Sequence, residues 1–264
     1  MNMFWRELRA HRRSLIVWCV CMALGVLSGM AKYPAYSAGT ASSRLFAQLP
    51  HSLRALLGMA DGDVTTLPGF YAFLFRYVQL TFAFHAALLG GGILAKEETD
   101  KTAEFLLAKP VSRAQVLTAK LMAAVVNVIV LNLVTFAVTV PAAAAYGKGH
   151  SIAGEVAAFH LSLLLLQLIF LAVGALCAAV RRNPAGAGAA ASGVVLAAWA
   201  VEEITTLSSR VSFLNVLSPF QYVDVGRVLG GRGLGPLAVL GSLLLAGALT
   251  AGAYAGYRRR DPRL

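Results

Sequence analysis

Residues 96–120 read KEETDKTAEFLLAKPVSRAQVLTAK, and this is the longest stretch of the chain that is dense in charges of both signs. Long apolar runs lie on each side of it. About 20 consecutive apolar residues cross the hydrocarbon core of a bilayer as a helix. A polar stretch between two such runs is typical of a structured loop held against a membrane, and we expect this loop to contact another protein.

The composition of the whole chain agrees with a membrane protein. Of the 264 residues, 58% are hydrophobic and 13% are charged, whereas soluble domains carry about 25% charged residues. The formal net charge is +11. The basic residues cluster at the ends of apolar runs and form no patch with interleaved aromatic residues, so we expect a lipid bilayer as partner and no nucleic acid.

The apolar runs predict an all-α membrane protein with a single transmembrane domain over residues 1–264. Six spans are expected, at about residues 14–31, 70–95, 121–146, 156–180, 185–207 and 236–257. Asn183 and Pro184 predict the start of the fifth span and Pro236 that of the sixth, because Asn caps helices and Pro is favoured at their first position.

The distribution of Lys and Arg predicts the orientation of the spans. If the N-terminus is cytoplasmic, most basic residues fall in the shorter segments on the cytoplasmic side, as the positive-inside rule requires. Both termini and the loop 96–120 are then cytoplasmic in a multi-pass protein of the cell membrane.

Two segments outside the spans carry predictions of their own. Residues 2–13 predict a short helix in the cytoplasmic interface, with a frayed basic tail as the alternative. The first apolar run is longer than that of a typical signal peptide, which favours a retained span. Residues 208–235 predict a short re-entrant helix that acts as a pore lid, with a simple outer loop as the alternative.

The loop itself predicts a helix, a proline break and a second helix. Acidic residues precede the segment 102–108, which suits the positive end of a helix. Pro110 ends this helix because it disfavours helical geometry at Lys109. Ser112 is placed to cap a second helix that begins at Arg113 and continues into the third span.

This pattern resembles the signature loop of type-2 ABC transporter permeases, the mainly exporting class. Lys101 stands where the family commonly has glycine. Segments 217–224 and 56–70 are similar to further segments of the family, so the resemblance covers nearly the whole chain. The matching residues in the loop are Glu97, Glu98, Thr102, Glu104, Leu106, Leu107, Pro110, Val111, Ser112, Arg113, Leu117 and Lys120.

The resemblance implies the permease subunit of an ATP-driven exporter. In that class the loop forms a coupling helix that docks on a separate ABC ATPase subunit, and two permeases, as a homodimer or a related heterodimer, join two ATPases. The residues expected to couple to the ATPase are Glu97, Glu98, Thr102, Glu104, Phe105, Leu106, Pro110 and Arg113.

The chain has no G-x-x-x-x-G-K-[ST] phosphate loop, since the run Gly90-Gly91-Gly92 lies in an apolar span and is interpreted as a packing feature. We therefore expect no cofactor on this chain, with ATP and Mg²⁺ bound by the partner ATPase, and no enzymatic activity of its own.

Polar residues within apolar spans are costly unless they are hydrogen-bonded, which makes them functional candidates. For the Asn and Gln side chains among them, the alternative is interhelical hydrogen bonding. Glu202 and Glu203 could face an exit vestibule that favours cationic substrates, or lie at the level of the lipid headgroups. Candidates for the translocation path are His85, Asn127, Gln167, Glu202 and Glu203, beside Asn132 and His160.

Two other classes of function compete with transport. A membrane anchor or assembly scaffold would have the same spans. An intramembrane enzyme would need a catalytic constellation, and the sequence has neither H-E-x-x-H nor paired membrane aspartates. Cys19, Cys21 and Cys177 lie in apolar runs and are interpreted as small buried residues, without a disulfide or a metal site.

Overall fold

Six long helices account for most of the described chain. The computed structural model describes residues 3–37, 39, 41–50, 53–54, 63–99, 112–147, 151–181, 186–222 and 225–259. All six helices are long and apolar enough to cross a membrane, which confirms the predicted all-α, six-span fold. They are α1 (Met3–Met30), α5 (Leu67–Thr99), α7 (Arg113–Ala144), α8 (Ala153–Val180), α9 (Ala187–Leu207) and α11 (Pro236–Arg259).

The predicted helix starts have different outcomes. Pro236 is the first residue of α11, as predicted. Helix α9 begins at Ala187, after Gly186. Asn183 and Pro184 themselves lie outside the described residues.

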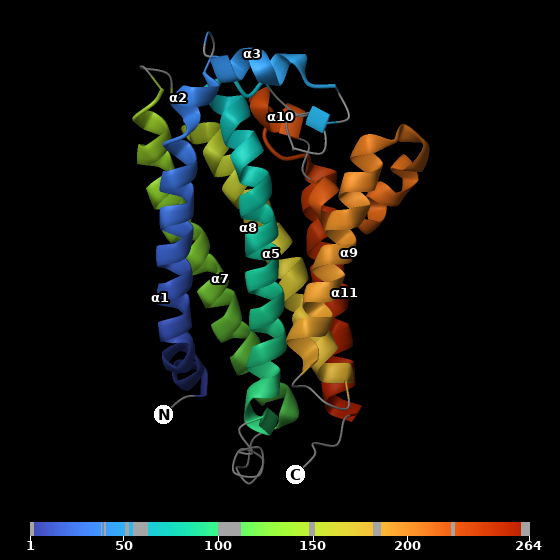
Figure 1. The fold of residues 1–264 in the computed structure, drawn as a ribbon. Coiled ribbons are helices and arrows are strands. Elements are labelled where there is room, and N and C mark those ends of the chain that lie inside the picture. The colour runs from blue at the N-terminus through green and yellow to red at the C-terminus, as the bar shows by residue number, and fades with distance from the viewer. Residues whose placement is uncertain are drawn as a thin grey trace.

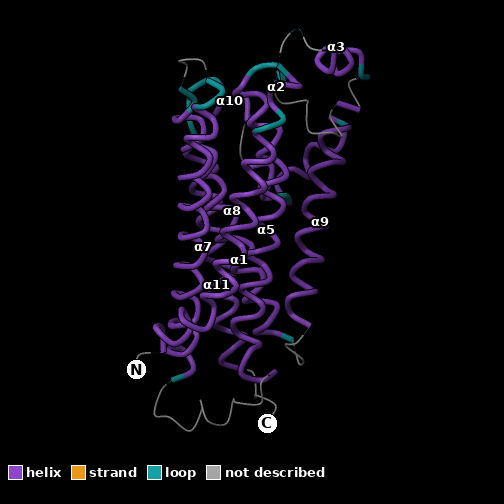
Figure 2. The backbone as a smooth tube through the Cα atoms, turned by 60° about the vertical axis from the view of Figure 1, so that its left-hand side comes forward, coloured by secondary structure: helices purple, strands orange, loops and turns teal. Residues whose placement is uncertain are grey.

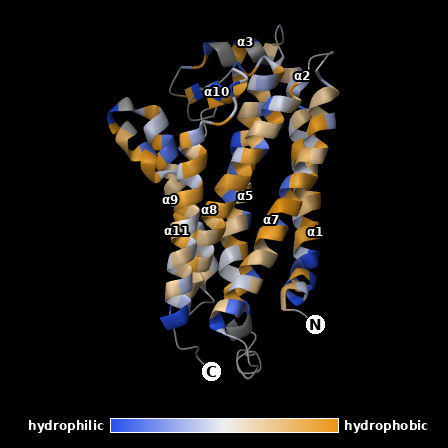
Figure 3. Ribbon diagram, turned by 180° about the vertical axis from the view of Figure 1, so that it is seen from behind, coloured by the Kyte–Doolittle hydropathy of each residue, from blue (hydrophilic) through white to orange (hydrophobic). Residues whose placement is uncertain are grey.

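The start of α1, the end of α5, the start of α7 and the end of α11 lie at one end of the bundle, here called the loop end (Figure 1, Figure 2). Apolar residues dominate the middle of the helices, and hydrophilic residues gather toward the ends (Figure 3). The opposite end, here called the far end, carries α2 (Tyr33–Tyr36), α3 (Ala41–Gln48) and α10 (Val225–Leu229). This arrangement agrees with the predicted topology, while the identity of the loop end as the cytoplasmic end stays a prediction.

Helices α5 and α8 pack closely at two glycines. A Cβ atom on Gly90 would overlap the carbonyl oxygen of Leu171, and one on Gly174 would overlap the carbonyl oxygen of Ala87. A Cβ atom on Gly91 would lie 3.0 Å from the backbone nitrogen of Gly188 in α9. The glycine run in α5 therefore lets three backbones approach one another, which supports its interpretation as a packing feature.

The predicted short helix at the N-terminus is continuous with the first span. Helix α1 runs without a break from Met3 to Met30, so residues 3–13 form its first turns. Phe4 and Leu8 pack against the buried core of the bundle, and Glu7 is buried. Contacts with the other helices therefore hold this segment as a helix and not as a frayed tail, and its place in the membrane interface stays a prediction.

The segment between α9 and α11 folds back onto the bundle. It contains two 3-10 helices, η2 (Ser209–Leu217) and η3 (Pro219–Tyr222), followed by α10. Phe220 packs between Phe170 of α8 and Trp199 of α9, with both ring-centroid distances at 5.4 Å. The Ser218 hydroxyl donates a hydrogen bond of 2.9 Å to the Ala198 carbonyl. Phe220 and Ser218 therefore attach this segment to α8 and α9. Its role as a lid stays a prediction.

Candidate functional site

The stems of the loop are well defined, whereas its tip is not described. Helix α5 ends at Thr99 and α7 begins at Arg113. Glu97 and Glu98 belong to the last turn of α5. The predicted helix over 102–108 lies outside the described residues, and so do the coupling candidates Thr102, Glu104, Phe105, Leu106 and Pro110.

The start of α7 is fixed by a capping box. The backbone N–H of Gln115 donates to the Ser112 hydroxyl at 3.2 Å, and the N–H of Ser112 donates to Gln115 Oε1 at 2.9 Å. Two backbone donors that the first turn would otherwise leave unpaired are thus satisfied. The predicted cap at Ser112 and the helix start at Arg113 are confirmed.

A buried lysine joins three helices beneath the loop. Lys120 of α7 is fully buried. Its ammonium donates a hydrogen bond of 2.7 Å to the Ile93 carbonyl in α5 and lies 3.5 Å from Glu7 Oε1 in α1. Arg6 also contacts Glu7, at 3.2 Å. A buried charge is tolerated only when it is paired and hydrogen-bonded, so this contact fixes the spacing of α1, α5 and α7.

Helix α11 meets the start of α7 at the same end. Arg113 donates a hydrogen bond of 3.3 Å to the carbonyl of Arg258. The hydroxyls of Thr118 and Tyr254 lie 2.6 Å apart. These two contacts, with the Lys120 cluster, form what we call the loop base, defined as Glu7, Ile93, Arg113, Thr118, Lys120, Tyr254 and Arg258.

A second charged cluster lies toward the far end, between α5 and α9. Arg76 Nη2 lies 2.8 Å from Glu203 Oε1, and its Nη1 lies 3.7 Å from Glu202 Oε1. The guanidinium also lies over the Trp199 ring, 5.2 Å from its centroid. Two carboxylates against one arginine give this outer charge cluster (Arg76, Trp199, Glu202 and Glu203) a formal charge of minus one when all three groups are ionised.

The pairing in the outer charge cluster was not predicted from the sequence. The sequence suggested a vestibule or the headgroup level for Glu202 and Glu203, and Arg76 was not among the predicted site residues. Yet Arg76 is a lone arginine in the second apolar span, and Glu202 and Glu203 form the acidic pair in the fifth. Charged residues within spans usually pair with one another, so that signal was present.

A group of polar side chains from α5, α7 and α8 is hydrogen-bonded in the interior of the bundle. Asn132 Nδ2 donates to Gln167 Oε1 at 3.1 Å and to the His160 carbonyl at 3.2 Å. His160 Nδ1 lies 3.0 Å from the Val156 carbonyl and 3.4 Å from the Tyr71 hydroxyl. Since a carbonyl only accepts, Nδ1 carries the hydrogen in the contact with Val156. This geometry fits interhelical hydrogen bonding for Asn132 and Gln167.

The remaining path candidates lie in other environments. Asn127 donates a hydrogen bond of 2.7 Å to the Ala123 carbonyl within its own helix. His85 packs edge-on against Trp18 of α1, with ring centroids 4.9 Å apart. The path candidates thus make their contacts in separate places, and their role in a translocation path stays a prediction.

Within the described ranges, no group of three or more His, Cys, Asp or Glu residues could hold a metal ion. Cys19, Cys21 and Cys177 are free cysteines. Lys120 pairs with Glu7 at the loop base, and Arg76 pairs with Glu202 and Glu203 in the outer charge cluster, so each cluster joins neighbouring helices.

Comparison with known proteins gives one match that spans almost the whole chain. A family model described as an ABC-2 family transporter protein matches residues 1–261. No curated protein matches the chain.

Proposed function

The chain belongs to the ABC-2 transporter family, and on that premise we propose that it is the membrane-spanning subunit of an ATP-driven exporter. Two copies of this subunit, or this chain with a related one, form the translocation path together with two ATPase subunits. Each ATPase binds ATP and Mg²⁺ and docks on the loop 96–120 at the cytoplasmic side. The chain itself carries no ATP-hydrolysing site.

The observation that best supports this proposal is the loop base. Lys120 is fully buried and contacts both the Ile93 carbonyl of α5 and the carboxylate of Glu7 in α1. Because Ile93 and Lys120 lie on the two stems of the loop, a displacement of the loop moves both stems together. The same displacement reaches α1 through Glu7.

The contacts with α11 extend this coupling to the last span. Arg113 bonds the backbone of Arg258, and Thr118 meets Tyr254. Proteins transmit small shifts over long distances when packed elements move as rigid bodies. We therefore propose that closure of the ATPase dimer pushes on the loop, and that the loop base passes this movement to α1, α5, α7 and α11 at once.

The proposal is tested by exchanging charges in the loop. The double variant Glu104→Lys, Arg113→Glu is purified with the cognate ATPase in lipid nanodiscs, and ATP hydrolysis is measured with and without the permease. The wild-type chain should form a complex and change the hydrolysis rate of the ATPase. The double variant should insert normally but lose this effect, because the two side chains that we expect to position the loop on the ATPase then carry the opposite charges.

The matched control is Arg232→Glu, a charge reversal at an exposed residue between α10 and α11. This control should behave as the wild type. A double variant that still changes the hydrolysis rate as the wild type does would refute the docking role of the loop. A wild-type chain that binds the ATPase without any effect on hydrolysis would instead support a scaffold.

A further inference from the structure

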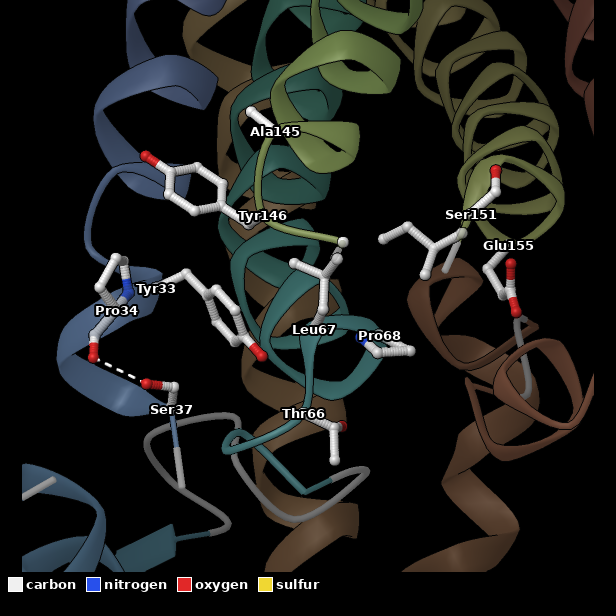
Figure 4. Close-up of a pocket in the computed structure, with 12 residues that line it drawn as sticks. Tyr33, Pro34, Ser37, Thr66, Leu67, Pro68, Ala145, Tyr146, Ser151 and Glu155 are labelled. Carbon is white, nitrogen blue, oxygen red and sulfur yellow. Dashed lines mark hydrogen bonds between the residues drawn. The ribbon is translucent and has the colours of Figure 1, made fainter. Parts of the chain in front are cut away.

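A cavity of about 730 Å³ opens at the far end, away from the loop base. It lies where α2, the start of α5, the end of α7 and the start of α8 meet (Figure 4). Ligand cavities in proteins usually have volumes of about 300–1,000 Å³. The cavity therefore has the size of a site for a small organic molecule.

Two tyrosine rings line one side of the cavity. Tyr33 of α2 and Tyr146, just after α7, meet edge to face, with centroids 6.1 Å apart and planes at 72°. The Tyr33 hydroxyl donates a hydrogen bond of 3.3 Å to the Thr65 carbonyl, and its ring packs on Phe70 at 5.4 Å. These contacts hold the Tyr33 ring in place, so part of the aromatic wall is formed before any ligand arrives.

The opposite side of the cavity carries a carboxylate. Glu155 lies in the first turn of α8, across the cavity from the tyrosines, with Ser151 beside it (Figure 4). Among the described residues that line the cavity, Glu155 is the only one with a formal charge. Its side chain is half-buried, where solvent screens its charge less than on an open surface.

We propose that this cavity binds an organic monocation that carries an aromatic or apolar group. The ammonium lies against the Glu155 carboxylate, and the apolar group packs on Tyr33 and Tyr146. Tyrosine faces attract both aromatic groups and cations. This site lies at the end opposite the ATPase loop, and its binding does not depend on the proposed transport function.

Glu155 also has a simpler role that the test must separate from binding. An acidic residue in the first turn stabilises a helix through its dipole. That role predicts a small loss of stability in a Glu155→Gln variant but no selective loss of a cationic ligand. A comparison of charged and neutral probes therefore distinguishes the two.

The experiment uses three probes and isothermal titration calorimetry on the full chain in nanodiscs, with empty nanodiscs as the blank for partition into lipid. The probes are 2-phenylethylammonium, its neutral analogue 2-phenylethanol, and ethylammonium, which lacks the ring. The first should bind more tightly than the other two, because it alone satisfies both sides of the cavity.

Variants of Glu155 and Tyr146 then test the contributions of the carboxylate and of the aromatic wall separately. Glu155→Gln should weaken binding of 2-phenylethylammonium about tenfold, the effect of one lost charge contact, and leave 2-phenylethanol unchanged. Tyr146→Leu should weaken both phenyl probes. Glu155→Asp, which retains the charge, should keep most of the binding, and Tyr222→Leu, a tyrosine of η3 that does not line this cavity, should have no effect.

Three results would overturn the proposal. They are equal binding of the two phenyl probes, no measurable binding of any probe, and unchanged binding of 2-phenylethylammonium to a folded Glu155→Gln variant. The elution volume and helical circular dichroism of each variant establish that it is folded before its binding is compared.

Discussion

Lys120 and Glu7 form a buried ion pair, with 3.5 Å between the lysine nitrogen and Glu7 Oε1, that joins the start of the third span to the first turns of α1. The two residues are more than one hundred positions apart in the sequence. Lys120 belongs to α7, the helix that follows the proposed ATPase contact in the chain.

We predict that Lys120→Met destabilises the protein by about 3 kcal/mol or more, since removal of one partner leaves the other charge buried. The double variant Lys120→Met, Glu7→Leu should recover much of this loss, because an apolar pair replaces an ionic one. Thermal unfolding in nanodiscs measures both. If the two substitutions are simply additive, with Glu7→Leu destabilising on its own as well, the ion pair is not the coupled unit described here.

In the outer charge cluster, we predict that loss of the arginine destabilises the protein more than loss of one glutamate charge. Arg76→Met should be strongly destabilising, by about 3–5 kcal/mol, because it removes the cation that pairs with the buried Glu202 and the partly buried Glu203. Glu202→Gln should cost much less, since Arg76 keeps Glu203 at 2.8 Å. Unfolding temperatures of the two variants decide this. A larger loss for Glu202→Gln than for Arg76→Met would contradict the assigned pairing.

In the glycine run of α5, substitution of Gly90 should change the stability of the protein, and Gly92 serves as the control position. Gly90→Ala should destabilise by about 1–3 kcal/mol, since its methyl group would overlap the Leu171 carbonyl in α8. Gly92 is exposed and has no neighbouring atom within 4 Å of an added Cβ atom. Gly92→Ala should therefore be neutral or stabilise the helix by about 0.5–1 kcal/mol. Equal effects at both positions would show that α5 and α8 do not pack as described.

Local signals in the sequence predicted much of this fold. Apolar runs of about 20 residues predict spans because the bilayer fixes their length. Ser112 and Pro236 mark helix starts because their effects act within one turn, and the structure places α7 and α11 where they indicate. Each of these predictions depends only on neighbouring residues.

Contacts between distant residues were beyond such signals. Residues 3–13 predicted a separate short helix, whereas the structure continues it into α1 and packs Phe4 and Leu8 on the core of the bundle. Lys120 was identified only as part of a motif, because its partners Glu7 and Ile93 come from other helices. Arg76 explains the positions of Glu202 and Glu203, and that pairing needs the packing of α5 on α9.

We propose that the loop 96–120 contacts an ATPase at the loop end of the bundle. The most direct test is photo-crosslinking in the native cells. A photoreactive amino acid replaces Phe105 in the loop, and a control version replaces Phe213, an exposed residue of η2.

Crosslinked partners are then identified by mass spectrometry. We predict that position 105 captures a protein that carries a G-x-x-x-x-G-K-[ST] phosphate loop, and that position 213 does not. Capture of such an ATPase from position 213 and not from position 105, or capture of none from position 105 in a correctly inserted protein, would contradict the account.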